Sequence, residues 1–321
     1  MVRSGLLVIG ALLSLFIQAG NFPLAGAAEK MRFGSSVKVN PLYVLPILAA
    51  EEKGYWKQRG LNVEFIPFKG GAKMQRAFVA GAVDMAISAA ISQVRSTSRG
   101  VPAVIVADMK ASNDIHVFVR SASPMKKPAD LKGAKVGINR IGGLVYTYGV
   151  ALARSLGIEK EVKFVAGGGF RQEVAGLRTG VLDAKISGVF AMAPLLHKGE
   201  VRSLVAVRPY LPKEWMDTMI ASHRNTVAKR PAEVEKTIQG MLEAGQFVLA
   251  DRAWATKKMM SYWRHSEGLA QKVYTMLSYG KGGRISRRAV ENMLKFMVDF
   301  KILKKGQLLP VNKYYTNRFV E

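Results

Sequence analysis

A repeat at an interval of 99 residues most strongly constrains how this chain of 321 residues can fold. Shifting the sequence by that interval aligns residues 37–88 with residues 136–187 without a gap and gives ten identical pairs, where an ordinary composition gives about four by chance. Two of these pairs are Asn40 with Asn139 and Ser88 with Ser187. A period this long indicates a duplicated lobe, because solenoid repeats are much shorter.

Each copy is typical of a β-α-β-α-β unit, because apolar runs with strand and helix periods alternate along it. The first copy predicts strands at 32–39, 62–67 and 85–88 and helices at 41–53 and 72–80. The second copy predicts strands at 135–138, 162–165 and 184–187 and helices at 143–156 and 171–178. After residue 206 the pattern becomes helical, with Pro231 suited to a first helical turn and Ser266 and Ser286 suited to N-caps. The fold class is therefore α/β.

The first 27 residues have the features of a secretion signal. Arg3 precedes an uncharged apolar run at residues 5–17, and Ala25, Gly26 and Ala27 form a small-residue cleavage site. The run is shorter than the roughly 20 residues that span a bilayer, although an uncleaved membrane anchor remains the alternative. We expect cleavage near Ala27 and Ala28 and an exported, freely soluble product that does not insert into a membrane.

Composition removes several classes of function. The 48 Lys and Arg against 23 Asp and Glu give a net charge of +25, but no run of five or six like charges marks a nucleic-acid arm, so we expect solvated basic faces. The chain has no cysteine, which excludes disulfides and thiolate metal sites. Its four histidines are far apart, and no nucleophile elbow or phosphate loop is present. We predict no catalytic residue, metal or cofactor.

Candidate binding residues come from the loops that follow the predicted strands, because ligands of open α/β sheets bind beyond the carboxyl ends of the strands. Asparagines at these places can instead be turn or cap residues, and the aromatic residues can belong to the core. Gly142 and Gly143, with Arg140 and Arg171, favour an anionic head group, unless both arginines merely belong to the basic surface. The full predicted set is Asn40, Tyr43, Gly71, Ser88, Ala89, Asn139, Arg140, Gly143, Phe170, Arg171 and Ser187.

Several segments resemble solute-binding proteins of ABC importers of the sulfonate, nitrate and taurine type, a family that includes binders of thiamine pyrimidine precursors. The first segment runs from residue 40 to 88 and contains the stretches AAEEKGYW, GLNV and AGAVD. The stretches PADLKGAKVGIN and GVLDAKISG are similar to the second lobe of that family. The loop at 139–144 departs from the family pattern, since it lacks the usual Ser or Thr.

The resemblance implies a type II periplasmic binding protein fold with a helical C-terminal extension of lobe 1. The implied organisation is lobe 1 at 28–120, lobe 2 at 121–208 and a second, mainly helical part of lobe 1 at 209–321, with crossings near 115–122 and 207–222. The implied function is capture of a small organic solute, sulfonate-like or carboxylate-like, by a periplasmic monomer that delivers it to an inner-membrane permease. The alternatives are an enzyme of thiamine-pyrimidine metabolism on the same fold and an exported binding module of a sensor.

Overall fold

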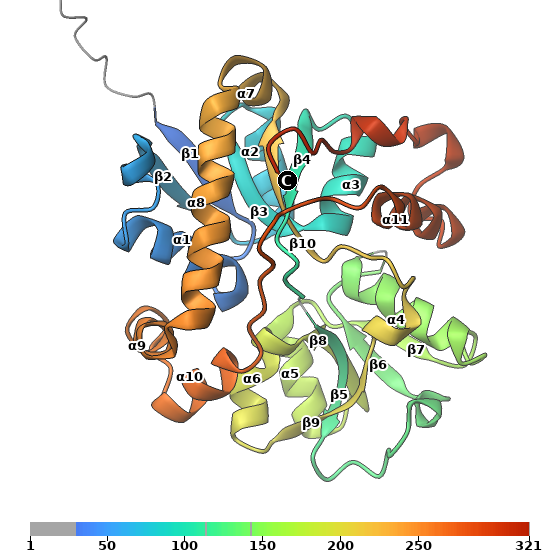
Figure 1. The fold of residues 1–321 in the computed structure, drawn as a ribbon. Coiled ribbons are helices and arrows are strands. Elements are labelled where there is room, and N and C mark those ends of the chain that lie inside the picture. Colours follow the sequence, from blue (N-terminus) through green and yellow to red (C-terminus); the bar gives the residue numbers. More distant parts are fainter. Residues whose placement is uncertain (1–29, 113, 142, 321) are drawn as a thin grey trace, which may run out of the picture.

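The computed structural model describes residues 30–112, 114–141 and 143–320, so the predicted secretion signal at 1–27 lies outside the described residues. Two five-stranded sheets, each surrounded by helices, form two lobes (Figure 1). The first sheet has the order β2-β1-β3-β10-β4 and the second has the order β7-β6-β8-β5-β9. The two lobes therefore share one topology, as the repeat predicts.

In each sheet the first three strands of that order run parallel, and the fourth runs antiparallel to both of its neighbours. The strands of the first sheet are β1 (Met31–Ser35), β2 (Val63–Pro67), β3 (Met85–Ala89), β4 (Ala103–Asp108) and β10 (Thr218–His223). Those of the second are β5 (Ile115–Arg120), β6 (Lys135–Ile138), β7 (Lys163–Ala166), β8 (Ala184–Gly188) and β9 (Val201–Ala206).

The antiparallel strand of each sheet is the strand that the chain forms directly after it crosses between the lobes. The first crossing joins β4 to β5, and the second joins β9 to β10. This corrects the expected boundary at residue 120, because Ile115–Arg120 is a strand of the second sheet and not a crossing segment. The second crossing ends earlier than expected, at residue 217, and the strand that follows it, β10, belongs to the first sheet.

Helices follow the parallel strands in both lobes. They are α1 (Pro41–Glu52), α2 (Gly71–Val79) and α3 (Ala90–Ser98) in the first lobe, and α4 (Leu144–Ser155), α5 (Phe170–Thr179) and α6 (Val189–His197) in the second. The C-terminal part adds α7 (Arg224–Lys229), α8 (Pro231–Ala250), α9 (Arg252–Trp263), α10 (Glu267–Tyr274) and α11 (Arg287–Asp299). Within the described residues, none of these helices combines the length and the apolar character that crossing a bilayer requires.

The ungapped alignment of the repeat is correct from β2 onward and wrong before it. Phe33 of β1 pairs with Met85, whereas Val136 of β6 pairs with Ala184, the equivalent of Met85 at the 99-residue interval. The first strand and helix of lobe 2 are therefore offset from those of lobe 1 by 103 residues. β1 accordingly ends at Ser35 and does not extend to residue 39 as expected.

The four extra residues of lobe 1 lie between α1 and β2, where the short 3-10 helix Lys57–Arg59 forms. This segment supports α8, which packs against α1 (Figure 1). Trp56 donates its indole N–H to the Thr237 carbonyl at 3.1 Å, and Arg59 forms an ion pair with Glu243 at 2.7 Å. The C-terminal part is not confined to lobe 1, because α10 contacts α6 of the second lobe.

Candidate functional site

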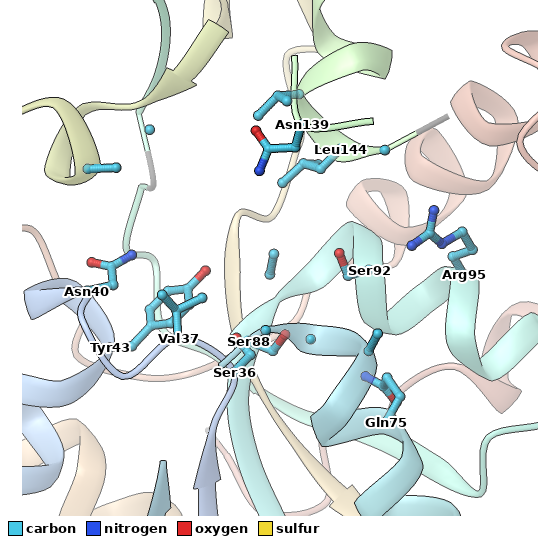
Figure 2. Close-up of a pocket in the computed structure, with 18 of the residues that line it drawn as sticks. Ser36, Val37, Asn40, Tyr43, Gln75, Ser88, Ser92, Arg95, Asn139 and Leu144 are labelled. Carbon is cyan, nitrogen blue, oxygen red and sulfur yellow. The ribbon is translucent and has the colours of Figure 1, made fainter. Parts of the chain in front are cut away.

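A cavity of about 710 Å³ lies between the lobes and is lined from both of them (Figure 2). The first lobe contributes the loops after β1 and β2, the end of β3 and one face of α3. The second lobe contributes the loop between β6 and α4 and the start of α6. These are the carboxyl ends of parallel strands, where this class of sheet presents its binding loops.

Eight of the eleven predicted site residues line this cavity. They are Asn40, Tyr43, Gly71, Ser88 and Ala89 of the first lobe and Asn139, Arg140 and Gly143 of the second. Figure 2 shows Asn40, Tyr43 and Ser88 on one side of the cavity and Asn139 on the other. These residues were predicted because they follow the carboxyl ends of predicted strands. That prediction requires the strands to be located correctly, but it does not require the correct register of the repeat.

Asn40 and Asn139 occupy different structural positions although the repeat aligns them. Asn40 is the N-cap of α1, and its Oδ1 accepts a hydrogen bond from the Leu42 N–H at 3.0 Å. The equivalent N-cap of α4 is Gly143, while Asn139 directly follows β6 as Ser36 follows β1. A Cβ at Gly143 would lie 3.0 Å from Arg140 Cγ and 3.1 Å from the Arg140 carbonyl oxygen, so glycine allows the Arg140 loop to fold over this helix start.

Three predicted residues lie outside the cavity lining. Phe170 is 38% exposed, and its ring faces Lys185 Nζ at 5.3 Å. Arg171 is exposed beside it at the start of α5. Ser187 is buried in β8 opposite His116, and the next residue, Gly188, lines the cavity instead. The prediction of an anion site shared by Arg140 and Arg171 is therefore corrected, and Gly142 of that site lies outside the described residues.

The polar face of α3 is the main feature that our sequence analysis missed. Ser92, Arg95, Ser96 and Arg99 all line the cavity, and Figure 2 shows Ser92 and Arg95 along this helix. Their spacing of i, i+3, i+4 and i+7 places them on one face of a helix. The stripe can be recognised in the sequence, but a polar stripe on a helix usually faces water. Here it lines a cavity because the second lobe lies opposite it.

Arg99 and Arg140 both lie close enough to Arg95 to influence its charge. Partial burial lowers the pKa of the Arg95 guanidinium, and the positive charges of Arg140 and Arg99 lower this pKa further. Arg140 belongs to lobe 2, so this repulsion acts across the cleft. Among the described residues that line the cavity there is no aspartate or glutamate. The arrangement therefore attracts negative charge.

A chain of buried hydrogen bonds fixes the cavity wall beside α3. Gln75 Nε2 donates to Gln93 Oε1 at 2.8 Å, Gln93 Nε2 donates to Thr97 Oγ1 at 3.2 Å, and Thr97 donates to the Ala103 carbonyl at 3.1 Å. Gln75 Oε1 is buried and has no hydrogen-bond partner within the described part of the chain. Because Gln75 also lines the cavity, a ligand N–H or O–H can satisfy this acceptor.

In the part of the chain that the structure describes, no three His, Asp or Glu side chains are grouped so that they could hold a metal ion.

Comparison with known proteins assigns the family. The NMT1/THI5-like family matches residues 42–255, two thirds of the chain and nearly all of both sheets. The chain belongs to the NMT1/THI5-like family. This match confirms the family resemblance found in the sequence.

Two curated relatives match shorter stretches. A Haemophilus influenzae protein whose name places it in thiamine biosynthesis is 32% identical over 143 residues, which is 43% of this chain and 44% of that protein. The 4-amino-5-hydroxymethyl-2-methylpyrimidine phosphate synthase THI11 of Saccharomyces cerevisiae is 29% identical over 112 residues, 35% of this chain and 33% of the enzyme. The chain thus spans less than half the length of each of these relatives.

Among solved structures, the periplasmic aliphatic sulphonate binding protein SsuA of Escherichia coli superposes with a TM-score of 0.76 at 15% identity, covering 89% of this chain and 91% of that one. At this identity the likeness establishes the fold alone. The expected type II periplasmic binding protein fold is confirmed, with two α/β lobes and a cavity between them.

Proposed function

We propose that this protein is the periplasmic solute-binding component of an ABC importer, which captures a small anionic organic solute, such as a sulfonate or a carboxylate, between its lobes and delivers it to a membrane permease. The observation that carries the proposal is the cavity of about 710 Å³ lined by both lobes, with Arg95, Arg99 and Arg140 in its wall. Its volume lies in the range of about 300 to 1,000 Å³ that is typical of small-molecule sites.

The starts of five described helices add to the attraction for an anion. The cavity lining includes the N-cap or first residue of α1, α2, α3, α4 and α6, namely Asn40, Gly71, Ala89, Gly143 and Gly188. Each helix start carries a partial positive charge and free N–H groups, which favour an anion by about 0.3 to 1 kcal/mol. Two lobes connected by two crossings suit capture by closure around a solute.

The decisive experiment is native mass spectrometry of the protein purified without added ligand, followed by release and identification of the bound compound. We expect a single anionic small molecule that is returned unchanged after incubation. Recovery of a chemically altered product would replace the transport function by an enzymatic one.

An enzyme of pyrimidine metabolism is the second candidate, favoured by the name of the Saccharomyces cerevisiae relative. A turnover assay separates the two functions, because a binding protein saturates at one equivalent and releases what it bound. A third candidate is an exported binding module that serves a sensor. Pull-down of the protein with reconstituted membranes of its host distinguishes a permease from a sensor kinase as partner.

Export remains part of the proposal. N-terminal sequencing of the protein from a periplasmic extract should give a first residue at or near Ala28, whereas an intact Met1 in the membrane fraction would show an anchored protein. A monomer is expected by sedimentation.

A further inference from the structure

A chain of hydrogen bonds between buried side chains ends in the cavity wall at Gln75. Gln75 of α2 is 9% exposed and lines the cavity, where Figure 2 shows its side chain. The other two members, Gln93 and Thr97 of α3, are almost fully buried. The far end of the hydrogen-bond chain is the carbonyl of Ala103, which lies 3.1 Å from Thr97 Oγ1.

The direction of these hydrogen bonds is fixed at the Ala103 end. A backbone carbonyl can only accept, so Thr97 donates its single hydroxyl hydrogen to Ala103. Thr97 Oγ1 therefore accepts from Gln93 Nε2, which leaves Gln93 Oε1 to accept from Gln75 Nε2. The orientation of both amides follows from this order. The remaining amide atom of Gln75, Oε1, can only accept a hydrogen bond.

This remaining acceptor lacks the partner that a buried polar atom normally has. Gln75 Oε1 is buried, and none of the described residues donates a hydrogen bond to it. Buried polar atoms in folded proteins nearly always have a hydrogen-bond partner, because an unsatisfied one destabilises the fold. Since Gln75 belongs to the cavity lining, a solute in the cavity is the partner that this position offers.

The second lobe shows that the fold does not require a polar hydrogen-bond chain at this place. Helices α2 and α3 of lobe 1 correspond to α5 and α6 of lobe 2 at the interval of 99 residues. The three counterparts of the polar side chains are apolar and pack in the core: Val174, Met192 and Leu196. The polar version occurs in the lobe whose α2 lines the cavity, which indicates a role in binding and not in folding.

We infer that Gln75 is a specificity-determining residue whose Oε1 accepts a hydrogen bond from an N–H or O–H group of the bound solute. Gln93 and Thr97 act as positioning residues, because they hold the Gln75 amide in the orientation that presents its oxygen. This inference rests on the proposed function and narrows its ligand class to solutes that carry a hydrogen-bond donor apart from their acid group.

Isothermal titration calorimetry with isethionate and propanesulfonate tests the inference. The two probes have the same sulfonate group and nearly the same size, and isethionate carries a hydroxyl where propanesulfonate carries a methyl group. We expect the wild type to bind isethionate about three- to tenfold more tightly, as one additional hydrogen bond between uncharged groups would give.

Two variants assign this preference to Gln75. Gln75→Met has a side chain of similar length without the amide, so the ratio of the two affinities should fall to about one while propanesulfonate binds within about twofold of the wild type. Gln172→Met is the matched control, because Gln172 is exposed on α5 and is not part of the cavity lining, and it should keep the wild-type ratio. Damage to the fold would weaken both probes together and leave the ratio unchanged.

The outcomes separate this inference from the proposed function. Equal affinity of the wild type for the two probes, a ratio that survives Gln75→Met, or failure of isethionate to bind at millimolar concentration overturns the inference. A further test is the compound released from the purified protein, whose exchangeable hydrogens are counted by mass spectrometry in D2O. A compound without an N–H or O–H outside its acid group overturns the inference and leaves solute binding intact. The proposed function fails separately, if the released compound is a chemically altered product.

Discussion

The side chain of Asp217 forms a hydrogen bond that links the two segments crossing between the lobes. It lies just before β10, and its Oδ2 accepts a hydrogen bond from the hydroxyl of Ser112 in the other crossing at 3.2 Å. Burial raises the pKa of this carboxyl to about 6, and the neighbouring Asp108 and Asp114 add to the increase, while the Ser112 hydrogen bond and Arg208 oppose it. An ionised Asp217 is therefore unfavourable in the folded protein.

This pKa predicts a pH dependence of stability with a definite sign. Because the folded pKa lies above the unfolded value, the native state binds more protons between about pH 4 and pH 6, and the free energy of unfolding falls as pH rises through that window. The loss is on the order of 1 to 3 kcal/mol. Asp217→Asn should remove it, as urea denaturation of both proteins at several pH values measures. Parallel pH profiles for wild type and variant would contradict the assignment.

Glu173 and Lys185 form an ion pair whose two side chains are completely buried in lobe 2. Burial lowers the pKa of the Lys185 ammonium, while its hydrogen bond to Glu173 raises it. Glu173 Oε1 has no hydrogen-bond partner among the described residues. At the equivalent positions lobe 1 has Met74 and Ala86, both fully buried, so the fold does not need charge at this place.

The comparison between the lobes leads to a prediction for a pair of substitutions. Glu173→Met alone should lower the free energy of unfolding by about 3 to 5 kcal/mol, because it leaves Lys185 buried without its partner. The double variant Glu173→Met, Lys185→Met should return close to the wild-type value, since an apolar pair of similar volume replaces the ion pair. Chemical denaturation of the wild type, Glu173→Met, Lys185→Met and the double variant completes the cycle, and a double variant as unstable as Glu173→Met would contradict the prediction.

At the scale of elements, the contact between α8 and the turn after α1 shows why the lobes differ in length. Among the described residues, lobe 2 has no counterpart of α8, and it also lacks the four additional residues that carry Trp56 in lobe 1. Gly240 of α8 faces the Trp56 ring so closely that a Cβ there would lie 2.5 Å from Trp56 Cδ1. The four-residue insertion that shifts the register of the repeat thus carries the surface against which α8 packs.

Gly240→Ala should therefore destabilise the protein by about 1 to 3 kcal/mol through overpacking. This is opposite in sign to the gain of up to about 1 kcal/mol that alanine gives in a helix interior. The measurement is the unfolding midpoint in denaturant. In a Trp56→Leu background, Gly240→Ala should no longer lower the free energy of unfolding, because the indole ring is gone. An unchanged destabilisation in that background would show that the strain does not come from Trp56.

At the scale of the whole molecule, the chain passes between the two lobes twice, between β4 and β5 and between β9 and β10. Lys110 and Asp114, in the first crossing, have left-handed backbone conformations with φ of 49° and 43°. Contacts outside the crossings also join the lobes, since α10 touches α6 and Arg154 of α4 lies over the Phe300 ring at 4.2 Å. A closing movement of the lobes would have to preserve these contacts or rearrange them.

The absence of cysteine from the sequence makes closure directly measurable. Dyes on Lys73→Cys in α2 and Arg171→Cys in α5, both exposed and in different lobes, should show a rise in energy transfer when the compound released from the purified protein is added back. A Lys57→Cys, Lys73→Cys pair within lobe 1 is the control and should show no change. A bound ligand without any change in transfer between the lobes would show that this cleft does not close on it.

The sequence by itself determined the α/β class, the duplication, most element bounds and eight of the residues that line the cavity. It could do so because strand and helix periods, caps such as Asn40, Ser266 and Ser286, and strand-end loops are local features.

Only the tertiary structure decided the rest. A four-residue insertion cannot be located by an ungapped match, and strand Ile115–Arg120 belongs to the second lobe through pairing with β8 and β9 alone. Whether a polar stripe faces water or a cleft, as for Arg95 and Arg99, depends on the position of the other lobe, which no local pattern encodes.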